Sequence, residues 1–433
     1  MQKPQAHQLT TLLVFLLIVG GYLTLLIAWP SAYVRATYED LYGEWGQWCQ
    51  YVAVVLLSGW LALRPSPYRW FYVALALAAF YTAGEEISWG QRLFGIVSPD
   101  FFDEYNLQGE TNLHNFLTGP VHSRSNDLMK YVVGVAIAGY GLVYPLLLRF
   151  GWSLATWVRG LGIPAPPLEL APFFTIAAVL ELGLFHFNES EVAEILIGCA
   201  LLFMLAGHAF RIRSGPVDGP LDASRSRRLA TLLTLLVLGM VVLAVTTTQL
   251  DSSDPDRRAV IEQRVLNGFE RYGNRFEELG QWRRSADLFT RAYEAQRSRT
   301  DLLVKLTANW RMAGDEVQYR RYYPELLERT VSPHQRWAPN VPQQLSMAYS
   351  DRENGDAATA AQHLEFARRL ATQATEQRPS DPEAAYTLGM VYEVMTDYGK
   401  AREQYGRAQT LLPSEAKYRS GYQRVDAYLH KAP

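Results

Sequence analysis

Seven long apolar stretches lie within the first 250 residues of this 433-residue chain, and none follows them. They run over 9–29, 46–63, 69–84, 127–148, 168–187, 191–210 and 229–249. Each is close to the ~20 residues that a helix needs to cross membrane hydrocarbon, although 69–84 and 168–187 are short or carry polar residues. The first is longer than the apolar core of a signal peptide, so we expect a retained anchor. The sequence therefore predicts an all-α fold that begins with a polytopic transmembrane bundle of about seven spans over residues 1–250.

The arginines between these stretches predict an orientation. They gather in the loops 64–69, 149–159 and 211–228, whereas the intervening loops carry aspartate and glutamate. Arginine close to the end of a span resists translocation, so these three loops are expected in the cytoplasm. With an odd number of spans, the N-terminus is then cytoplasmic and residues 251–433 are extracytoplasmic. In a Gram-negative cell this predicts an inner-membrane protein with a periplasmic C-terminal domain.

Composition narrows the choice of partners. Cys49 and Cys199 are the two cysteines, and both fall in predicted spans, which excludes a disulfide-stapled exported domain. The formal net charge is −2, and the residues after Leu250 interleave arginine with aspartate and glutamate without a basic stripe. Nucleic acid is therefore not an expected partner, whereas a membrane lipid is.

The residues after Leu250 repeat a pattern of small and large side chains. The first copy contains Gly273, Phe276, Gly280, Trp282, Ser285, Phe289 and Ala292, and the last contains Gly389, Tyr392, Tyr398, Ala401, Tyr405, Ala408 and Pro413. Phe276 and Gly280 lie 34 residues before Trp310 and Gly314, which belong to a second copy. This period and pattern resemble the tetratricopeptide (TPR) repeat, in which two antiparallel helices need small residues where their backbones approach.

The remaining copies are read in the same way. A looser one contains Tyr349, Gly355, Ala360, Leu364 and Ala367, and we expect its helix-to-helix turn to be lengthened. In the last copy Asp381 should cap a helix that has Pro382 in its first turn. Prolines 333, 339 and 342 predict a bend or insertion over 331–343. The resemblance implies a soluble TPR-like α-solenoid whose concave surface holds a protein or peptide partner, and the spacing does not identify the residues of that surface.

Two motifs in the membrane half are more polar than a lipid-facing boundary requires. One is Gly84-Glu-Glu-Ile-Ser-Trp-Gly-Gln-Arg92, and the other is Asn106-Leu-Gln-Gly-Glu-Thr-Asn-Leu-His-Asn115. Carboxylates at the end of a span are costly unless they are paired, hydrogen-bonded or facing a polar cavity. The two motifs together resemble segments of polytopic bacterial membrane proteins of unassigned function.

These motifs predict a composite site at the outer ends of the spans. Glu86 and His114 are the candidate catalytic base and acid. Glu85, His114 and His186 are candidate ligands of one divalent metal such as zinc. Arg92 is the candidate partner of an anionic headgroup, and the other candidate substrate-binding residues are Gln91, Asn112 and Asn115. In the structural alternative, a glutamate caps a helix and pairs with Arg92 while the amide side chains satisfy loop backbone.

Two functions remain open at this point. In the first, the protein is a scaffold that presents its TPR-like domain, residues 251–433, for protein interaction or complex assembly. In the second, it is a membrane-embedded hydrolase or transferase that acts on a lipid or lipid-linked substrate through the Glu/His cluster.

Overall fold

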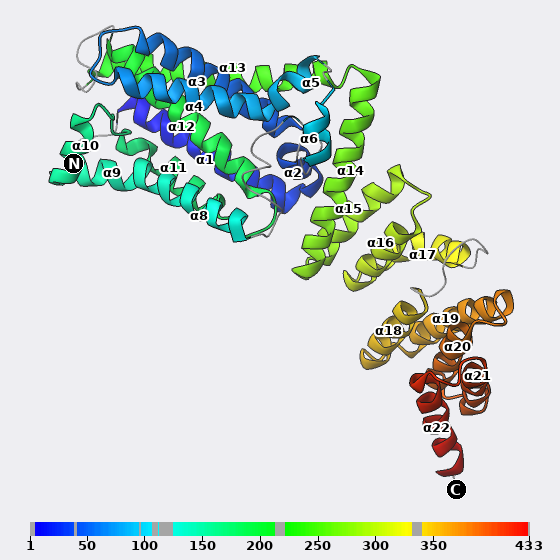
Figure 1. The fold of residues 1–433 in the computed structure, drawn as a ribbon. Helices are drawn as coiled ribbons and strands as arrows, with labels where there is room; N and C mark the ends of the chain where they lie inside the picture. The colour runs from blue at the N-terminus through cyan, green and yellow to red at the C-terminus, as the bar shows by residue number, and fades with distance from the viewer. Residues whose placement is uncertain are drawn as a thin grey trace. The chain divides into compact units, whose positions relative to one another are not determined.

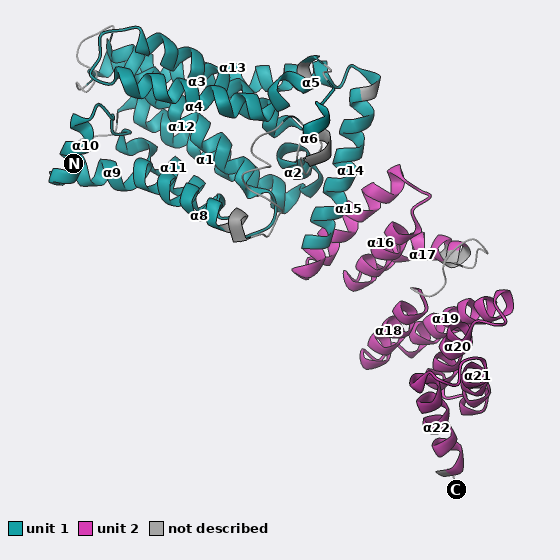
Figure 2. Ribbon diagram, viewed as in Figure 1, with its two compact units in different colours: residues 1–275 teal, residues 276–433 magenta. Residues whose placement is uncertain are grey.

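The computed structural model describes residues 5–38, 41–94, 97–105, 111, 124–212, 221–330 and 340–431. Every regular element in these ranges is a helix, which confirms the all-α prediction (Figure 1). The chain divides into two compact units, residues 1–275 and residues 276–433 (Figure 2). The boundary predicted at 250/251 divides residues expected in the membrane from residues expected outside it, whereas the boundary at 275/276 divides compact units. The predicted boundary therefore stays a prediction.

The main elements described in unit 1 are α-helices. They are α1 (Ala6–Ala28), α2 (Pro30–Thr37), α3 (Tyr42–Ala62), α4 (Arg69–Glu86), α5 (Gln91–Phe94), α6 (Asp100–Tyr105), α8 (Arg124–Ala138), α9 (Tyr144–Arg149), α10 (Ser153–Gly160), α11 (Ala171–Leu180), α12 (Glu189–Ile212), α13 (Ala223–Asp251) and most of α14 (Pro255–Glu278). A π-helical turn, Gly139–Val143, joins α8 to α9 without a break in the helix.

Four helical segments of unit 1 are long and apolar enough to cross a membrane. They are Ala6–Ala28, Leu128–Arg149, Glu189–Ile212 and Ala223–Asp251, and they coincide with four of the seven predicted spans. Residues Leu168–Leu180 form a shorter apolar helix. Helices α3 and α4 cover two further predicted stretches, with 21 and 18 residues. The described residues thus support four candidate spans, and the count of seven stays a prediction.

Helix α12 lies at the centre of unit 1, whereas α1 and α13 lie at its surface. In the most apolar window of α12, 61% of the residues are buried, against 11% in α1 and in α13. The core around α12 contains Phe173 and Phe174 of α11 together with Leu196 and Phe203. Close packing depends on Gly141, because a Cβ there would lie 2.0 Å from the Phe174 side chain. Small residues therefore let the helices approach closely. This kind of contact is typical of helices packed within a membrane.

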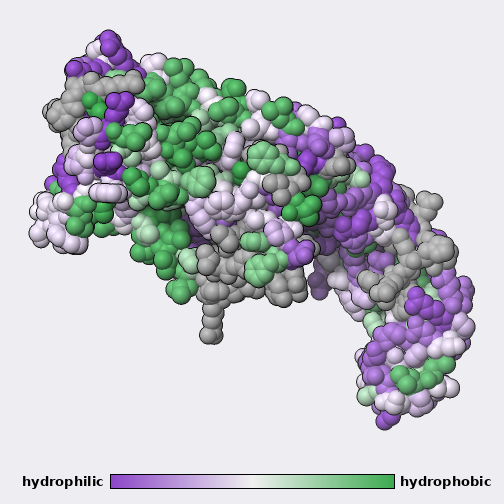
Figure 3. Space-filling view, turned by 45° about the horizontal axis from the view of Figure 1, so that its top comes forward, coloured by the Kyte–Doolittle hydropathy of each residue, from purple (hydrophilic) through white to green (hydrophobic). Residues whose placement is uncertain are grey.

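The surface of unit 1 carries many large apolar side chains. On α1 they include Leu9, Leu12, Leu13, Leu16 and Leu17, each between 46% and 64% exposed. Figure 3 shows apolar residues gathered over the helices of unit 1 on the face turned to the viewer, whereas the visible surface of unit 2 is mainly hydrophilic. A contiguous apolar surface of this kind marks contact with lipid or with another protein.

Unit 2 consists of shorter helices in succession. After the end of α14 they are α15 (Trp282–Ala295), α16 (Thr300–Met312), α17 (Glu316–Thr330), α18 (Asn340–Glu353), α19 (Ala357–Gln377), α20 (Pro382–Val394), α21 (Tyr398–Leu411) and α22 (Ala416–Lys431). Each described helix from α15 packs on the next one along the chain within α15–α17 and within α18–α22. The predicted insertion over 331–343 is helical from Asn340, and its residues 331–339 lie outside the described ranges.

Four turns in this part of the chain share one geometry. Gly280, Gly314, Gly355 and Thr396 each have positive φ, between 64° and 79°. At each turn the N–H of this residue donates to the carbonyl three residues earlier, and the next N–H donates to the carbonyl five residues earlier. This is the left-handed helix end that glycine favours. The repeat predicted from Gly280 and Gly314 is therefore present four times in the backbone.

The third copy differs from its prediction. Its turn is not lengthened, because α18 ends at Glu353 and α19 begins at Ala357, with the same three-residue connection as α16 to α17. The additional residues lie in α19, which has 21 residues where α15 has 14. Gly355 marks the turn correctly, and Tyr349 lies six residues before it, whereas Phe276 lies four residues before Gly280 in the first copy.

The predicted small positions are buried between helices. Ala292, Ala367, Ala401 and Ala408 are fully buried. Gly389 lies against the ring of Tyr405, and a Cβ there would come within 2.7 Å of that ring. The predicted cap is also present, since the Asp381 carboxylate accepts the N–H of Glu383 at 2.9 Å. These contacts confirm the alignment of the last copy.

A buried polar network joins α16 and α17 to α18 and α19. Arg311 Nη2 donates to Asp351 Oδ1 at 2.6 Å, and the two side chains are 21% and 8% exposed. His363, which is fully buried, contacts the Tyr319 hydroxyl at 3.1 Å and Gln344 Oε1 at 2.6 Å through its ring nitrogens. Burial lowers the pKa of His363 to about 4, so this imidazole is neutral at pH 7.

Candidate functional site

The first polar motif forms a tight turn at the end of α4. Three consecutive residues, Ser88, Trp89 and Gly90, have φ values of 47°, 52° and 93°. Non-glycine residues rarely adopt this left-handed backbone, and such positions cluster at functional sites. The turn folds the Trp89 ring back over Gly84, where a Cβ would lie 3.0 Å from the ring. Glycine at position 84 is therefore required by the turn.

Glu85 takes part in the same turn. Trp89 Nε1 donates to Glu85 Oε1 at 2.6 Å, and the indole also packs edge-on against Phe80 and Tyr81. A hydrogen bond to a carboxylate is among the stronger side-chain interactions, so it helps to hold the left-handed turn. The structure thus gives Glu85 a positioning contact, and its predicted role as a metal ligand remains a prediction.

Glu86 is half-buried and contacts a glutamate of α12. Its side chain forms a hydrogen bond with that of Glu194 on α12, and Glu181 lies close enough to interact with Glu194 electrostatically. The Tyr51 hydroxyl of α3 lies 3.5 Å from the Glu194 backbone carbonyl. Two carboxyl groups can be hydrogen-bonded to each other only when they share a proton. The arrangement can therefore hold a proton among carboxylates at the end of α4.

His186 lies in a loop that one glutamate organises. The Glu189 carboxylate accepts backbone N–H groups of Phe185, His186 and Phe187 at 2.5, 3.2 and 2.8 Å. Glu189 is 4% exposed, whereas the His186 side chain is exposed and its backbone has φ of 60°. The sequence analysis missed this role of Glu189, although an acidic residue at the start of a helix is a recognised signal for such contacts.

Helix α14 is anchored on the same loop. The Tyr272 hydroxyl donates to the Phe187 carbonyl at 3.0 Å, and Arg275 Nε donates to the Phe185 carbonyl at 2.9 Å. The Tyr33 hydroxyl reaches the Phe187 carbonyl as well, at 3.2 Å. The first helix after the last candidate span is thus part of unit 1, held by buried tyrosines at the end of the bundle that carries Glu189.

The other predicted site residues divide into two groups. His114, Asn112 and Asn115 lie outside the described residues, and Arg92 lies in α5 with a side chain that is not described. Gln91 is described, and its Oε1 accepts the Ser98 hydroxyl at 3.2 Å and the Thr111 N–H at 3.1 Å. It thereby ties the loop around 98 to position 111, so it positions backbone next to the second motif.

The metal prediction is not supported by a described cluster. Among the residues whose placement is given, no group of three or more histidine, cysteine, aspartate or glutamate side chains could hold a metal ion. His114, which the prediction requires, is not among them. The predicted zinc site therefore stays untested.

A groove on unit 2 is the second candidate site. It has a volume of about 600 Å³ and is lined by Pro342, Leu345, Ser346 and Tyr349 of α18, by Tyr386, Met390, Glu393 and Val394 of α20, and by Arg424 of α22. These are the first helices of successive pairs, so the groove follows the repeat. Six of its nine lining residues have apolar or aromatic side chains, and Tyr349 is 53% exposed although it is a large aromatic residue.

An ion pair forms the polar side of this groove. Arg424 donates to both oxygens of Glu393, at 2.6 and 2.8 Å, and the Tyr405 hydroxyl donates to Glu393 at 2.5 Å. Burial alone would raise the pKa of Glu393, but the hydrogen bonds from Arg424 and Tyr405 hold this pKa below its usual range. Glu393 is therefore charged at neutral pH and fixes Arg424 in place. The sequence analysis did not identify this groove, and the i, i+4 pairs Leu345/Tyr349 and Tyr386/Met390 were the available signal.

Comparisons with known proteins give little further information. No protein-family model and no curated protein matches the chain. A solved structure, the TPR domain of P58(IPK), aligns with 70% of this chain and 93% of its own length at 14% identity, with a TM-score of 0.18. A superposition of this quality carries no argument, so the repeat interpretation depends on the four turns and the buried small residues described above.

Proposed function

We propose that this protein is a membrane-embedded scaffold whose helical-repeat domain docks a segment of a partner protein. Two observations support membrane embedding: the four long apolar helices and the exposed leucines along α1. The proposal includes about seven spans, a cytoplasmic N-terminus, an exported C-terminal domain and a location in a bacterial inner membrane, all of which follow from the apolar stretches and the arginine-rich loops.

The groove of α18, α20 and α22 is the observation that carries the docking function. Helical repeats characteristically bind extended segments along a concave surface. The lining residues Tyr349, Met390 and Val394 suit an apolar or aromatic side chain of the partner. Ser346 and Arg424 can donate to the carbonyl oxygens of an extended segment. We therefore expect a partner segment with an apolar anchor next to exposed backbone.

The experiment places a photocrosslinking amino acid at Ser346 in the full-length protein in cells. We expect crosslinks to one partner segment, lost in the Met390→Glu variant and retained in Val317→Glu, which changes a residue of α17 that is 77% exposed and outside the groove. A synthetic peptide of the captured segment should bind the purified full-length Met390→Glu variant at least about tenfold more weakly, since a buried unpaired charge costs several kcal/mol. Equal binding by both variants would exclude the groove.

The enzymatic alternative stays a prediction with one supporting observation, the contact between the side chains of Glu86 and Glu194. Glu86→Gln, compared with Glu85→Gln as the matched neighbour, tests it. If only the first abolishes the phenotype of the gene at an unchanged protein level, the Glu86 carboxylate has a chemical role. Full complementation by Glu86→Gln would exclude the enzymatic alternative at this residue and would leave the scaffold function as the proposal.

A further inference from the structure

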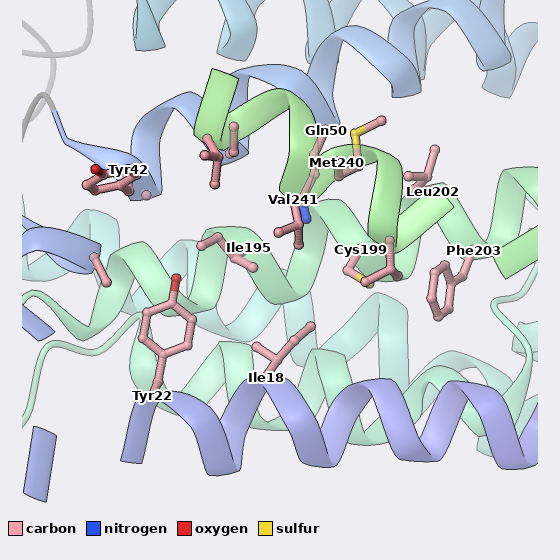
Figure 4. Close-up of a pocket in the computed structure, with 16 residues that line it drawn as sticks. Ile18, Tyr22, Tyr42, Gln50, Ile195, Cys199, Leu202, Phe203, Met240 and Val241 are labelled. Carbon is pink, nitrogen blue, oxygen red and sulfur yellow. The ribbon is translucent and has the colours of Figure 1, made fainter. Parts of the chain in front are cut away.

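An apolar groove in unit 1 runs between the two surface helices and the central one. It has a volume of about 290 Å³ and is formed by α1, α3, α12 and α13. Toward one end it is lined by Tyr22 and Tyr42, and toward the other by Leu202 and Phe203 (Figure 4). Val241 and Val245 of its wall are 56% and 46% exposed, so the groove is accessible from the surface of the bundle.

One polar atom in this groove is unexplained. Gln50 Oε1 is buried and has no hydrogen-bond partner within the described part of the chain. The amide lies against Gly198 of α12, where a Cβ would be 2.5 Å from this oxygen, so glycine makes room for it. An unpaired amide oxygen in hydrocarbon costs free energy that a hydrogen-bond donor would recover.

The dimensions of the groove restrict its occupant. A helix with side chains is about 10–12 Å across, and a pocket of this volume is at the small end of the range for small ligands. Gln50 lies eight residues into α3, which is ~12 Å along the helix from Tyr42. A thin, chain-like molecule whose polar end lies near Tyr22 and Tyr42 would therefore carry its hydrogen-bond donor within ~12 Å of that end.

We propose that this groove binds one alkyl chain of a membrane lipid, and that the chain carries a hydroxyl or amide N–H that donates to Gln50 Oε1. The tyrosines lie at its headgroup end, and the side chains around Cys199 and Phe203 surround its distal carbons. The inference rests on the membrane-embedded bundle proposed above and is independent of partner docking by unit 2.

The test uses the full-length protein in vesicles of phosphatidylethanolamine and phosphatidylglycerol. Two photoactivatable lipids differ only in one chain, which is β-hydroxymyristoyl in one and myristoyl in the other. We expect the hydroxylated probe to label the groove segments of α12 and α13 about fivefold more strongly, because one net hydrogen bond is worth about 1 kcal/mol. Gln50→Leu should make the two probes equal.

A second set of variants fills the groove with larger side chains. Gly46 faces Ala244 across the groove, with 3.8 Å between that Cβ and an added one, whereas Gly59 on the same helix faces open space. Gly46→Leu should reduce groove labelling roughly tenfold, and Gly59→Leu should leave it unchanged. Ala244→Phe replaces Gly46→Leu if that variant does not insert. Labelling that is uniform over α1 and α13 and insensitive to both groove-filling variants would overturn the site, and equal labelling by both probes in the wild type would overturn the role of Gln50.

Discussion

Units 1 and 2 are both built from helices and both bury large apolar side chains, but unit 1 also carries many such side chains on its surface. In unit 1 the leucines of α1 lie at the surface, while the core around α12 contains phenylalanine, leucine and alanine. In unit 2 large side chains such as Leu288, Phe289 and Tyr405 are fully buried, while the surface carries ion pairs such as Arg320–Glu316 and Arg368–Glu365. The difference shows that a large apolar residue in the sequence does not by itself mark a core position. In unit 1 many such residues lie on the surface.

The two units also use buried charge differently. Unit 1 gathers carboxyl groups, with Glu86 and Glu194 hydrogen-bonded to each other. Unit 2 balances charge, with Arg311 against Asp351 and a neutral His363 beside them. A balanced network is expected to stabilise one packing of the repeats, whereas grouped acids have no evident value for stability.

The largest effect should follow from breaking the balanced network of unit 2. Arg311→Met leaves the Asp351 carboxylate, 8% exposed, without its cation. We expect a loss of about 3–5 kcal/mol in the free energy of unfolding, as for other buried pairs in which one partner is removed. Hydrogen exchange of peptides from α16 to α19 in the purified full-length protein measures it. Arg320→Met, which removes an exposed pair, should cost about 0–1 kcal/mol, and equal losses in both would refute the difference between the two sites.

Acidification should weaken unit 2 through His363. Because its pKa is about 4 in the folded chain and 6.5 in the unfolded chain, the unfolded state binds the additional proton between these values. The stabilisation is complete above pH 6.5 and is lost as the pH falls to about 4, by roughly 3 kcal/mol at ~1.4 kcal/mol per pKa unit.

The same exchange experiment between pH 6.5 and 4.5 checks this dependence. His363→Gln should remove most of the slope in that window, whereas His430→Gln, whose side chain is 70% exposed, should keep it. Carboxyl groups such as Asp356 and Glu393, with pKa values below their usual ranges, titrate at lower pH. An unchanged slope in His363→Gln would show that the imidazole is not the group responsible.

The repeats could be predicted because they depend on local rules. Gly280, Gly314 and Gly355 mark turns that need positive φ, and Ala401 marks a close helix approach, so their spacing is visible in the sequence. Thr396 adopts the same left-handed conformation although it is not glycine. The spacing of glycines could not predict this turn. The groove of unit 2 was not predicted, because it depends on which side chains of α18, α20 and α22 face one another across more than 70 residues of sequence.

The site in the membrane half was predicted less well for a related reason. The density of carboxylates made residues 84–92 a candidate site, but the sequence does not show their contacts: Glu86 contacts Glu194 of a distant helix, whereas Glu85 contacts Trp89 within its own turn. Two neighbouring glutamates on one helix point in different directions. Their contacts can therefore be told apart only when the packing of α4 against α12 is known. Glu189, three residues after the candidate ligand His186, organises a loop, and this role was not predicted from the sequence.

The smallest expected effect tests whether α1 faces lipid. Leu13 is 57% exposed, and its neighbour Val14 is 7% exposed and packs in the core around α12. In detergent or bilayer, Leu13→Ala exchanges one apolar contact with acyl chains for a slightly smaller one, so the change should stay within ~0.5 kcal/mol. Val14→Ala leaves a cavity and should cost at least about 1 kcal/mol although it removes fewer atoms. Thermal unfolding of the two purified variants gives the comparison. A larger loss for Leu13→Ala than for Val14→Ala would mean that a protein surface covers the leucines of α1, and unit 1 would then resemble unit 2 in having its large apolar residues against protein.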